Sequence, residues 1–164
     1  MEIYIRPLKE DDSIISFRWR NDPEIWTLTG NKPDKIITPE IELEWIRNIL
    51  TRVNEKRFAI CIKETNEYIG NAQLTDVDSN EAQYHLFIGE KKFWGKGIGT
   101  KVANLILNYA FFNLRLKTVY SYFQPGNLAS LKACEKAGFK FKEIVNSELL
   151  LICNKEYYFE SDNH

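Results

Sequence analysis

Alternating apolar and polar positions along the chain predict a series of short strands separated by turns. The clearest pair, residues 57–64 and 67–77, flanks a Thr-Asn dipeptide and predicts a β-hairpin. A final pair of strands around Asn146-Ser147 is predicted within residues 139–160. The other predicted strands cover residues 2–7, 81–89 and 116–123.

Apolar residues at helical spacing predict four helices between these strands. Segment 38–50 carries the strongest signals, because Thr38 suits the N-cap and Pro39 suits the first helical position. Residues 27–37 contain Gly, Asn and Pro, which predict an irregular loop. The other predicted helices run from the acids at 10–12 to Asn21-Asp22-Pro23, from the glycines at 95–99 to Phe111, and over 127–138. Together these elements predict a single α/β (α+β) domain over residues 1–164.

Composition and charge narrow the function classes. The 164 residues carry a net charge of −1, which argues against a broad nucleic-acid surface. No segment approaches eighteen apolar residues and the N-terminus lacks a secretory pattern, so we expect a cytoplasmic protein with no membrane contact. The odd, widely spaced cysteines predict neither disulfides nor a zinc site. With only His85 and His164 as histidines, no metal site is predicted.

The segment "WGKGIG" (94–99) is the first candidate for chemistry. A glycine-rich turn between a strand and a helix leaves backbone N–H groups unpaired in front of the helix dipole, which suits a pyrophosphate. The Gly-x-Gly-x-Gly spacing departs from the dinucleotide fingerprint, and residues 113–121 lack the acid that this fingerprint requires. The segment does not fit a P-loop either, and a plain glycine turn is the alternative.

A second segment, "NLASLKACEKAGF" (127–139), follows a strand about thirty residues later. Together the two segments resemble the Gcn5-related N-acetyltransferases (GNAT), in the branch with ribosomal-protein alanine, amino-sugar and polyamine acetyltransferases. The segments "IRPLKEDD" and "RWRNDPE" also resemble that branch, so the likeness covers roughly residues 3–145. It implies a mixed, mostly antiparallel sheet with about four helices. This sheet splays between strands 81–89 and 116–123, and the pantetheine arm of acetyl-CoA lies in the splay.

The resemblance also assigns cofactor contacts by position. Backbone groups of Phe87, Ile88 and Gly89 would meet the pantetheine and the thioester oxygen. Asn127 would bond the pantetheine arm, with Ser130 assisting. The pyrophosphate cradle would consist of Gly95, Lys96, Gly97, Ile98, Gly99 and Thr100.

Candidates for proton transfer lie on one strand and one helix. Glu81, Gln83 and His85 share one face of their predicted strand, and Gln83 stands where related enzymes carry a glutamate base. His85 is therefore the first candidate base and Glu81 the second, although a buried structural histidine is the alternative. Cys134 stands where many relatives carry a tyrosine acid. We expect core filling there rather than catalysis, which leaves a tyrosine of strand 116–123, Tyr120 or Tyr122, or water as the proton source.

The resemblance places the amine acceptor near the early helices, where Arg18, Trp19, Asn21 and Trp26 are candidates. A guanidinium binds phosphate and an indole packs on a sugar ring, so an amino-sugar nucleotide is the favoured acceptor over a polyamine. Packing of Trp19 and Trp26 onto the sheet is an equally weighted alternative. A ribosomal-protein N-terminal alanine acetyltransferase and a non-catalytic acyl-CoA-binding protein remain alternative functions. A homodimer is also compatible with the sequence.

Overall fold

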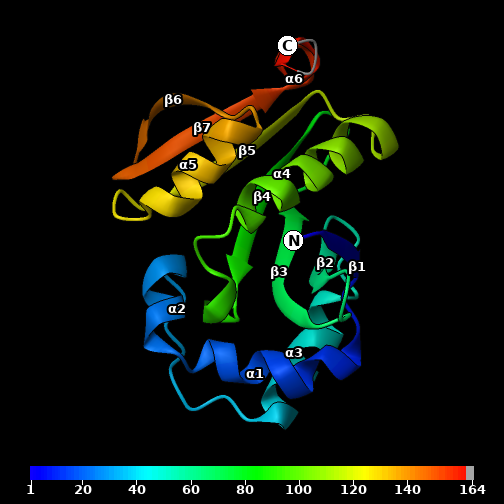
Figure 1. Cartoon of the computed structure of the whole chain (residues 1–164), viewed down its shortest axis with the longest axis vertical. Helices are drawn as coiled ribbons and strands as arrows, with labels where there is room; N and C mark the ends of the chain where they lie inside the picture. The colour runs from blue at the N-terminus through cyan, green and yellow to red at the C-terminus, as the bar shows by residue number, and fades with distance from the viewer. Residues whose placement is uncertain (162–164) are drawn as a thin grey trace.

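A seven-stranded sheet in the order β1-β2-β3-β4-β5-β7-β6 forms the centre of the computed structural model, which describes residues 1–161 (Figure 1). His164 lies outside the described residues. The strands are β1 (Ile3–Pro7), β2 (Lys56–Ile62), β3 (Tyr68–Thr75), β4 (Glu81–Ile88), β5 (Thr118–Phe123), β6 (Lys140–Val145) and β7 (Glu148–Asn154). The α-helices are α1 (Ser13–Arg20), α2 (Pro23–Thr29), α3 (Pro39–Ile49), α4 (Ile98–Asn108), α5 (Leu128–Ala137) and α6 (Lys155–Ser161). Shorter helical turns are η1 (Glu10–Asp12), η2 (Lys91–Phe93) and the π-helical η3 (Tyr109–Asn113).

The sheet is antiparallel except between β4 and β5, which run parallel. These two strands pair only from Glu81 to Gln83 and then separate, which confirms the predicted splay. At the fork, the Ser121 hydroxyl donates a hydrogen bond of 2.6 Å to the Tyr84 carbonyl, where a strand ladder would otherwise continue. The gap therefore opens at Tyr84 and widens toward the C-terminal end of β4.

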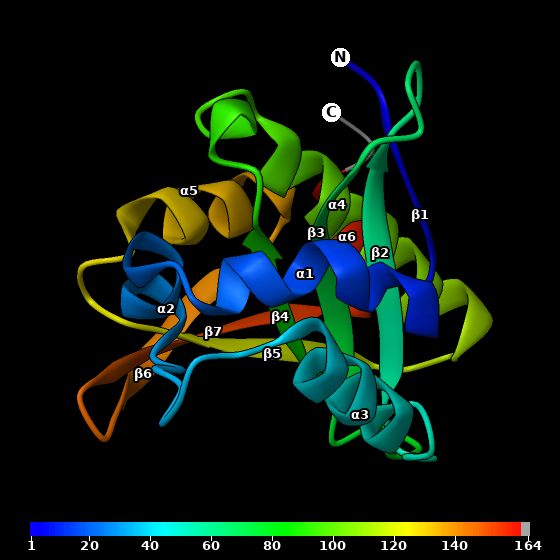
Figure 2. The same ribbon diagram turned by 90° about the horizontal axis from the view of Figure 1, so that it is seen from below.

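Helices cover both faces of the sheet (Figures 1 and 2). On one face, α1 and α3 pack on β2 and β3 through a cluster that includes Trp19, Ile46 and Tyr68. On the other face, α4 and α5 pack together over a larger core that includes Tyr84 and Ile106. Side chains of β4 alternate between these two layers, so neighbouring residues of the strand meet different surroundings.

The first of two corrections to the predicted elements concerns the first helical segment. The structure has a separate helix, α2, whose last turn occupies Thr27–Thr29 of the segment predicted as a loop. The Asp22 carboxylate accepts the N–H of Glu24 as an N-cap, Pro23 takes the first turn, and Gly30 ends the helix with φ +75°. The Asn-Asp-Pro segment that predicts a helix end is thus also a helix start.

The second correction concerns the end of the chain. The predicted last strand extends to residue 160, whereas β7 ends at Asn154 and α6 follows. Asn154 pairs with Thr118, where β5 begins, so the strand has no partner beyond it. The chain then turns into a helix that packs Tyr158 against Phe111. With α2 and α6, the described residues contain two more helices than the four predicted.

Several local predictions are confirmed. The Thr38 hydroxyl accepts the N–H of Ile41 and Pro39 opens α3. Asn146 and Ser147 both have positive φ, as the tight turn of a two-residue hairpin requires. Within residues 1–161, no helix has the length and apolar character needed to cross a membrane.

Candidate active site

A cavity of about 640 Å³ lies where β4 and β5 diverge and extends toward α1, α2 and α3. Strands β3, β4 and β5 and helix α5 line one part of it, and the N-terminal helices and the loop after α2 line the other. We call these parts the strand half and the acceptor half. The strand half includes Asn71, Gln73, Thr75, Tyr84, His85, Leu86, Phe87, Ser121, Tyr122, Phe123, Gln124, Asn127, Ser130 and Cys134. The acceptor half includes Trp19, Arg20, Ile25, Trp26, Leu28, Thr29, Asn31, Lys32, Pro33, Asp34, Glu42, Trp45 and Arg57.

The glycine loop lies beside this cavity, at the exposed N-terminus of α4. Gly95 and Gly97 have φ of +72° and +76°, whereas Lys96 between them has a negative φ. Residues that alternate between left-handed and right-handed backbone conformations point successive N–H groups into one concavity. Gly97 is the N-cap of α4 and provides no side-chain cap, and the first turn carries no acid. The loop therefore fits an anion, since the N–H groups and the helix dipole are left for a ligand.

Open space surrounds both glycines. A Cβ at Gly95 or Gly97 would meet no atom of the described residues within 4 Å. Gly99 differs, because a Cβ there would lie 3.2 Å from Ala133 Cβ, where α4 crosses α5. Positive φ favours glycine at Gly95 and Gly97, where the surrounding space is open, and helix packing favours glycine at Gly99.

Trp94, the first residue of the WGKGIG segment, has a structural contact. Its indole N–H donates to the Ile88 carbonyl at 2.8 Å and holds the loop against the end of β4. The N–H of Gly89 bonds the Ile69 carbonyl at 2.7 Å, and a Cβ on Gly89 would overlap the Trp19 ring. Of the three residues expected to contact pantetheine, only Phe87 lines the cavity. The Ile88 carbonyl and the Gly89 N–H already form hydrogen bonds within the chain.

The remaining predicted cofactor contacts lie on α4, on α5 and at the residues just before these helices. Asn127 and Ser130 line the cavity at the start of α5, where the Asn127 side chain accepts the Ser130 N–H. The Thr100 hydroxyl donates to the Ala133 carbonyl at 3.3 Å and ties α4 to α5. Lys96 is exposed, and Ile98 is buried beneath the loop.

His85 points to the acceptor side of β4, opposite Tyr84. Its Nε2 lies 3.0 Å from the Thr75 hydroxyl, which fixes the orientation of the ring. Burial, followed by the positive charge of Arg57, lowers the pKa of His85. The ring is therefore neutral near neutral pH and can accept a proton. Glu81 starts the same strand about 13 Å away and does not line the cavity.

Cys134 lines the strand half but is almost fully buried, and burial raises the pKa of its thiol to about 12. The sulfur packs in the large core between α5 and the sheet. This placement agrees with the expectation of core filling. A buried thiol is a weak hydrogen-bond donor.

Replacing Cys134 with alanine is expected to keep kcat within about threefold. The loss of a buried sulfur should lower the free energy of unfolding by about 1 kcal/mol. Thermal unfolding and steady-state rates of Cys134→Ala measure both quantities. A loss of kcat far beyond threefold, with unchanged Tm, would contradict core filling.

The predicted acceptor residues have different environments. Trp26 lines the acceptor half, and Trp19 lines it while packing edge-on against Tyr68. The Asn21 side chain bonds both backbone groups of Ile37, so it holds the loop after α2. Arg18 does not line the cavity and lies 3.6 Å from Glu90.

Three cations at the cavity are not identifiable from the sequence pattern. Arg20 and Arg57 lie over the Trp45 ring, with guanidinium carbons 4.8 and 5.5 Å from its centroid. Lys32 lies over Trp26, with its Nζ 5.4 Å from the ring centroid. These residues come from α1, β2 and the loop after α2, so only the folded chain brings them together.

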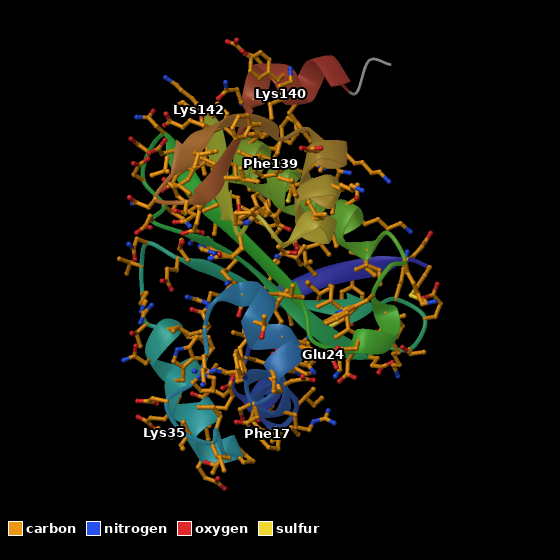
Figure 3. The ribbon with its side chains drawn as sticks, turned by 90° about the vertical axis from the view of Figure 1, so that its left-hand side faces the viewer. Phe17, Glu24, Lys35, Phe139, Lys140 and Lys142 are labelled. Atoms are coloured by element: carbon orange, nitrogen blue, oxygen red, sulfur yellow. The ribbon has the colours of Figure 1, made fainter. Side chains whose placement is uncertain are left out.

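Three acids in or near the acceptor half are paired with cations. The buried Glu42 accepts hydrogen bonds from the Ser16 hydroxyl and from Arg20, each 2.9 Å long. Asp22 and Glu24 bind Lys91 at 2.8 and 3.2 Å and join α2 to the loop after β4; Glu24 is labelled in Figure 3. Within residues 1–161, no group of three or more His, Cys, Asp or Glu side chains could hold a metal ion.

Comparison with known protein families gives a consistent result. A protein-family model described as an acetyltransferase (GNAT) domain matches residues 2–140. The chain is 30% identical over 145 residues to the probable N-acetyltransferase YjcK of Bacillus subtilis (strain 168), covering 84% of this chain and 80% of YjcK. It is 24% identical over 145 residues to the uncharacterized N-acetyltransferase p20 of Bacillus licheniformis, covering 83% of this chain and 78% of p20.

Solved structures share the fold. Spermidine N-acetyltransferase from Vibrio cholerae, in complex with CoA and spermine, has a TM-score of 0.84 at 18% identity, covering 96% of this chain and 98% of that one. Aminoglycoside acetyltransferase AAC(6')-Ib, in complex with coenzyme A, has a TM-score of 0.83 at 18% identity, with 98% and 99% covered. Campylobacter jejuni N-acetyltransferase PseH, in complex with acetyl coenzyme A, has a TM-score of 0.71 at 18% identity, with 94% and 99% covered.

Proposed function

The chain belongs to the GNAT acetyltransferase family, and on this premise we propose that it transfers an acetyl group from acetyl-CoA to the primary amine of an amino-sugar nucleotide. The observation that carries the acceptor is the acceptor half of the cavity, where cations and tryptophans lie together. An amino-sugar nucleotide offers a ring for the indoles and a diphosphate for the cations.

The donor side of the proposal rests on the glycine loop and the splay. The open, uncapped N-terminus of α4 would bind the pyrophosphate of acetyl-CoA through Gly95, Lys96 and Gly97. The pantetheine arm would follow the gap between β4 and β5, past Asn127 and Phe87. The three solved structures, with coenzyme A or acetyl coenzyme A bound to the same fold, support this donor.

Charge separates the acceptor classes. A polyamine or an aminoglycoside carries several positive charges and is favoured by a cavity with free carboxylates. Here Arg20 pairs with Glu42 and Arg57 pairs with Glu55, each at 2.9 Å, whereas the lining residues Lys32 and Asp34 form no ion pair among the described residues. Lys32 would attract a diphosphate and repel a polycationic acceptor.

The chemistry assigned to the chain is proton removal from the amine. His85 lies on the acceptor side of β4, and its lowered pKa keeps the imidazole ready to take a proton near neutral pH. Thr75 holds Nε2 at 3.0 Å and so limits rotation of the ring. The donor supplies the activated acetyl group, and the chain orients it against the amine.

A panel of amines tests the acceptor. Each amine is incubated with acetyl-CoA, and free thiol release is followed for nucleotide-linked amino sugars, spermidine, an aminoglycoside and N-terminal peptides. We expect the highest kcat/KM for a nucleotide-linked amino sugar. Turnover of peptides alone, or of spermidine alone, would reject the proposed acceptor.

Replacing Lys32 with alanine is expected to raise KM for the nucleotide-linked sugar about threefold to tenfold, because one charge-assisted contact to the diphosphate is lost. KM for the same sugar without its diphosphate should change much less. Lys35→Ala is the matched control, since Lys35 is also exposed in the loop after α2 but does not line this cavity. Equal effects of both variants on both sugars would exclude a specific phosphate contact at Lys32.

A further inference from the structure

Asn71 places a carboxamide at the cavity, although the residue is only 7% exposed. Its side-chain oxygen accepts a hydrogen bond from the Tyr68 hydroxyl, whereas its nitrogen has no hydrogen-bond partner among residues 1–161. Of the described side-chain polar atoms, the Tyr84 hydroxyl alone is both sealed from solvent and unpaired, so the Asn71 nitrogen remains accessible. An N–H donor is therefore open to a molecule that enters the cavity.

A β-bulge in β3 explains how Tyr68 and Asn71 meet. Side chains three residues apart on a regular strand point to opposite faces of the sheet. The register of Tyr68 and Gly70 against β2 leaves Ile69 as an extra residue, whose side chain packs in the large core under α4 and α5. Tyr68 and Asn71 consequently both face the other side of the sheet, which α1 crosses, and form their hydrogen bond there (Figure 2).

Tyr68 fixes which end of the Asn71 carboxamide faces the cavity. The only hydrogen bond of the Tyr68 hydroxyl among the described residues is the one to the carboxamide oxygen. A phenol proton without an acceptor is unfavourable in a core, so the phenol donates and the oxygen accepts. Burial, followed by the charge of Asp12, raises the pKa of Tyr68 and keeps this proton in place. The carboxamide therefore presents its N–H groups, and not its oxygen, to a ligand.

The N–H groups of Asn71 lie one step along the sheet from the proposed base. Gln73 is directly opposite His85 in the antiparallel pair, and Asn71 lies two residues from Gln73 on the same face. Such diagonal neighbours are about 7 to 8 Å apart. Two hydrogen bonds of about 2.9 Å, one to each residue, fit an amine and an oxygen on adjacent carbon atoms within this distance. Phe87, directly opposite Asn71, packs edge-on against Trp19 and forms an apolar wall beside the donor.

We propose that Asn71 selects the acceptor by donating a hydrogen bond to an oxygen on the carbon beside the reacting amine. This inference deepens the proposed function and rests on it for an amine that meets His85. A hydroxyl or acetamido oxygen on a sugar ring accepts this bond. An ammonium group at the same place has donors only and meets the positive end of the N–H dipoles, so it is disfavoured. Asn71 is thus a specificity-determining residue, and Tyr68 is a positioning residue that acts through it.

Three nucleotide-linked amino sugars test this assignment. A hydroxyl sugar, a deoxy sugar and a diamino sugar carry a hydroxyl, a hydrogen and a second amino group, respectively, on the carbon beside the reacting amine. Titration calorimetry measures their binding to the CoA-bound protein, and the diphosphate common to all three cancels in the ratios. The wild type should bind the hydroxyl sugar about threefold to tenfold more tightly than the deoxy sugar, the net effect of one hydrogen bond. The diamino sugar should bind most weakly.

Replacing Tyr68 with phenylalanine frees the carboxamide to rotate and to present its oxygen. This variant is expected to bind the diamino sugar about threefold to tenfold more tightly than the wild type does, and to keep its preference for the hydroxyl sugar over the deoxy sugar. The double variant Tyr68→Phe/Asn71→Leu removes both partners of the buried hydrogen bond, so neither is left unpaired. In the double variant the hydroxyl and deoxy sugars should bind equally.

Tyr4→Phe is the matched control, because the Tyr4 hydroxyl also donates to an asparagine side-chain oxygen, that of Asn66, at 2.9 Å. Neither Tyr4 nor Asn66 lines the cavity, so the control should leave the ratios of the three affinities unchanged. A purely structural role for Tyr68 and Asn71 would lower the Tm of their variants without changing these ratios.

The outcomes separate this inference from the proposed function. A wild type that binds the hydroxyl and deoxy sugars equally would overturn the role of Asn71 and leave the proposed acceptor in place, and this comparison requires no variant to fold. A double variant that keeps the wild-type ratio would do the same. A Tyr68→Phe protein that still rejects the diamino sugar would overturn the fixed orientation of the carboxamide. A wild type that binds none of the three sugars would overturn the proposed acceptor class and this inference with it.

Discussion

Replacing Gly97 with valine is expected to abolish measurable acetyl-CoA binding. In the free protein a Cβ at this position meets no atom within 4 Å, so the added side chain fits the fold but occupies the space proposed for the pyrophosphate. Valine also disfavours the φ of +76° at the N-cap of α4, which would turn the N–H groups away from the anion. Titration calorimetry with acetyl-CoA measures the loss.

The backbone strain itself needs a control. Gly30 ends α2 with φ +75°, close to that of Gly97, and a Cβ there would approach only the Gln124 side chain at 3.8 Å. Gly30→Val should therefore lose a similar stability, about 1 to 2 kcal/mol, and still bind acetyl-CoA. Unchanged acetyl-CoA affinity in a folded Gly97→Val protein would place the donor elsewhere.

Replacing His85 with alanine is expected to lower kcat/KM by about 10²-fold, within the range for a lost general base. Affinity for acetyl-CoA should remain near that of the wild type, because His85 faces the acceptor side of β4. Gln83→Ala is the matched control, since Gln83 lies on the same face of the strand but does not line the cavity. Full activity of His85→Ala would show that the histidine is structural.

The pH dependence of the wild-type enzyme tests the same role. Only the neutral imidazole accepts a proton, and burial places the pKa of His85 below the ordinary value of 6.5. Activity should therefore be constant above that value and fall as the pH drops through the lowered pKa. In His85→Ala this acidic limb should disappear from the profile of kcat/KM.

Local sequence signals determined most of the elements, because each depends on residues close together in the chain. Thr38 and Pro39 start α3, Asn127 caps α5, and Asn146-Ser147 turns the last hairpin. The glycine loop is also determined locally, because Gly95 and Gly97, two residues apart, both adopt the positive φ that glycine favours. One error has a local cause, because Asp22-Pro23 stops one helix and starts another. The other has a long-range cause, because no local signal shows that β7 loses its partner after Asn154.

The cavity and its charges were decided by tertiary structure. Arg20, Lys32 and Arg57 meet around two tryptophans only because α1, the loop after α2 and β2 converge. Arg18, two residues from Arg20, lies on a different side of α1 and contacts Glu90 instead. Helical periodicity separates the two side chains, but it does not show which of them faces the cavity.

The environment of the Tyr84 hydroxyl was also decided by tertiary structure. An alternating strand pattern places Tyr84 and His85 on opposite faces, and the sequence by itself determined that much. Whether a buried hydroxyl finds a partner depends on Phe139, Ser121 and Cys134, which lie far along the chain. Sequence patterns determine which side of an element faces inward, but the contacts that complete a site depend on packing between distant segments.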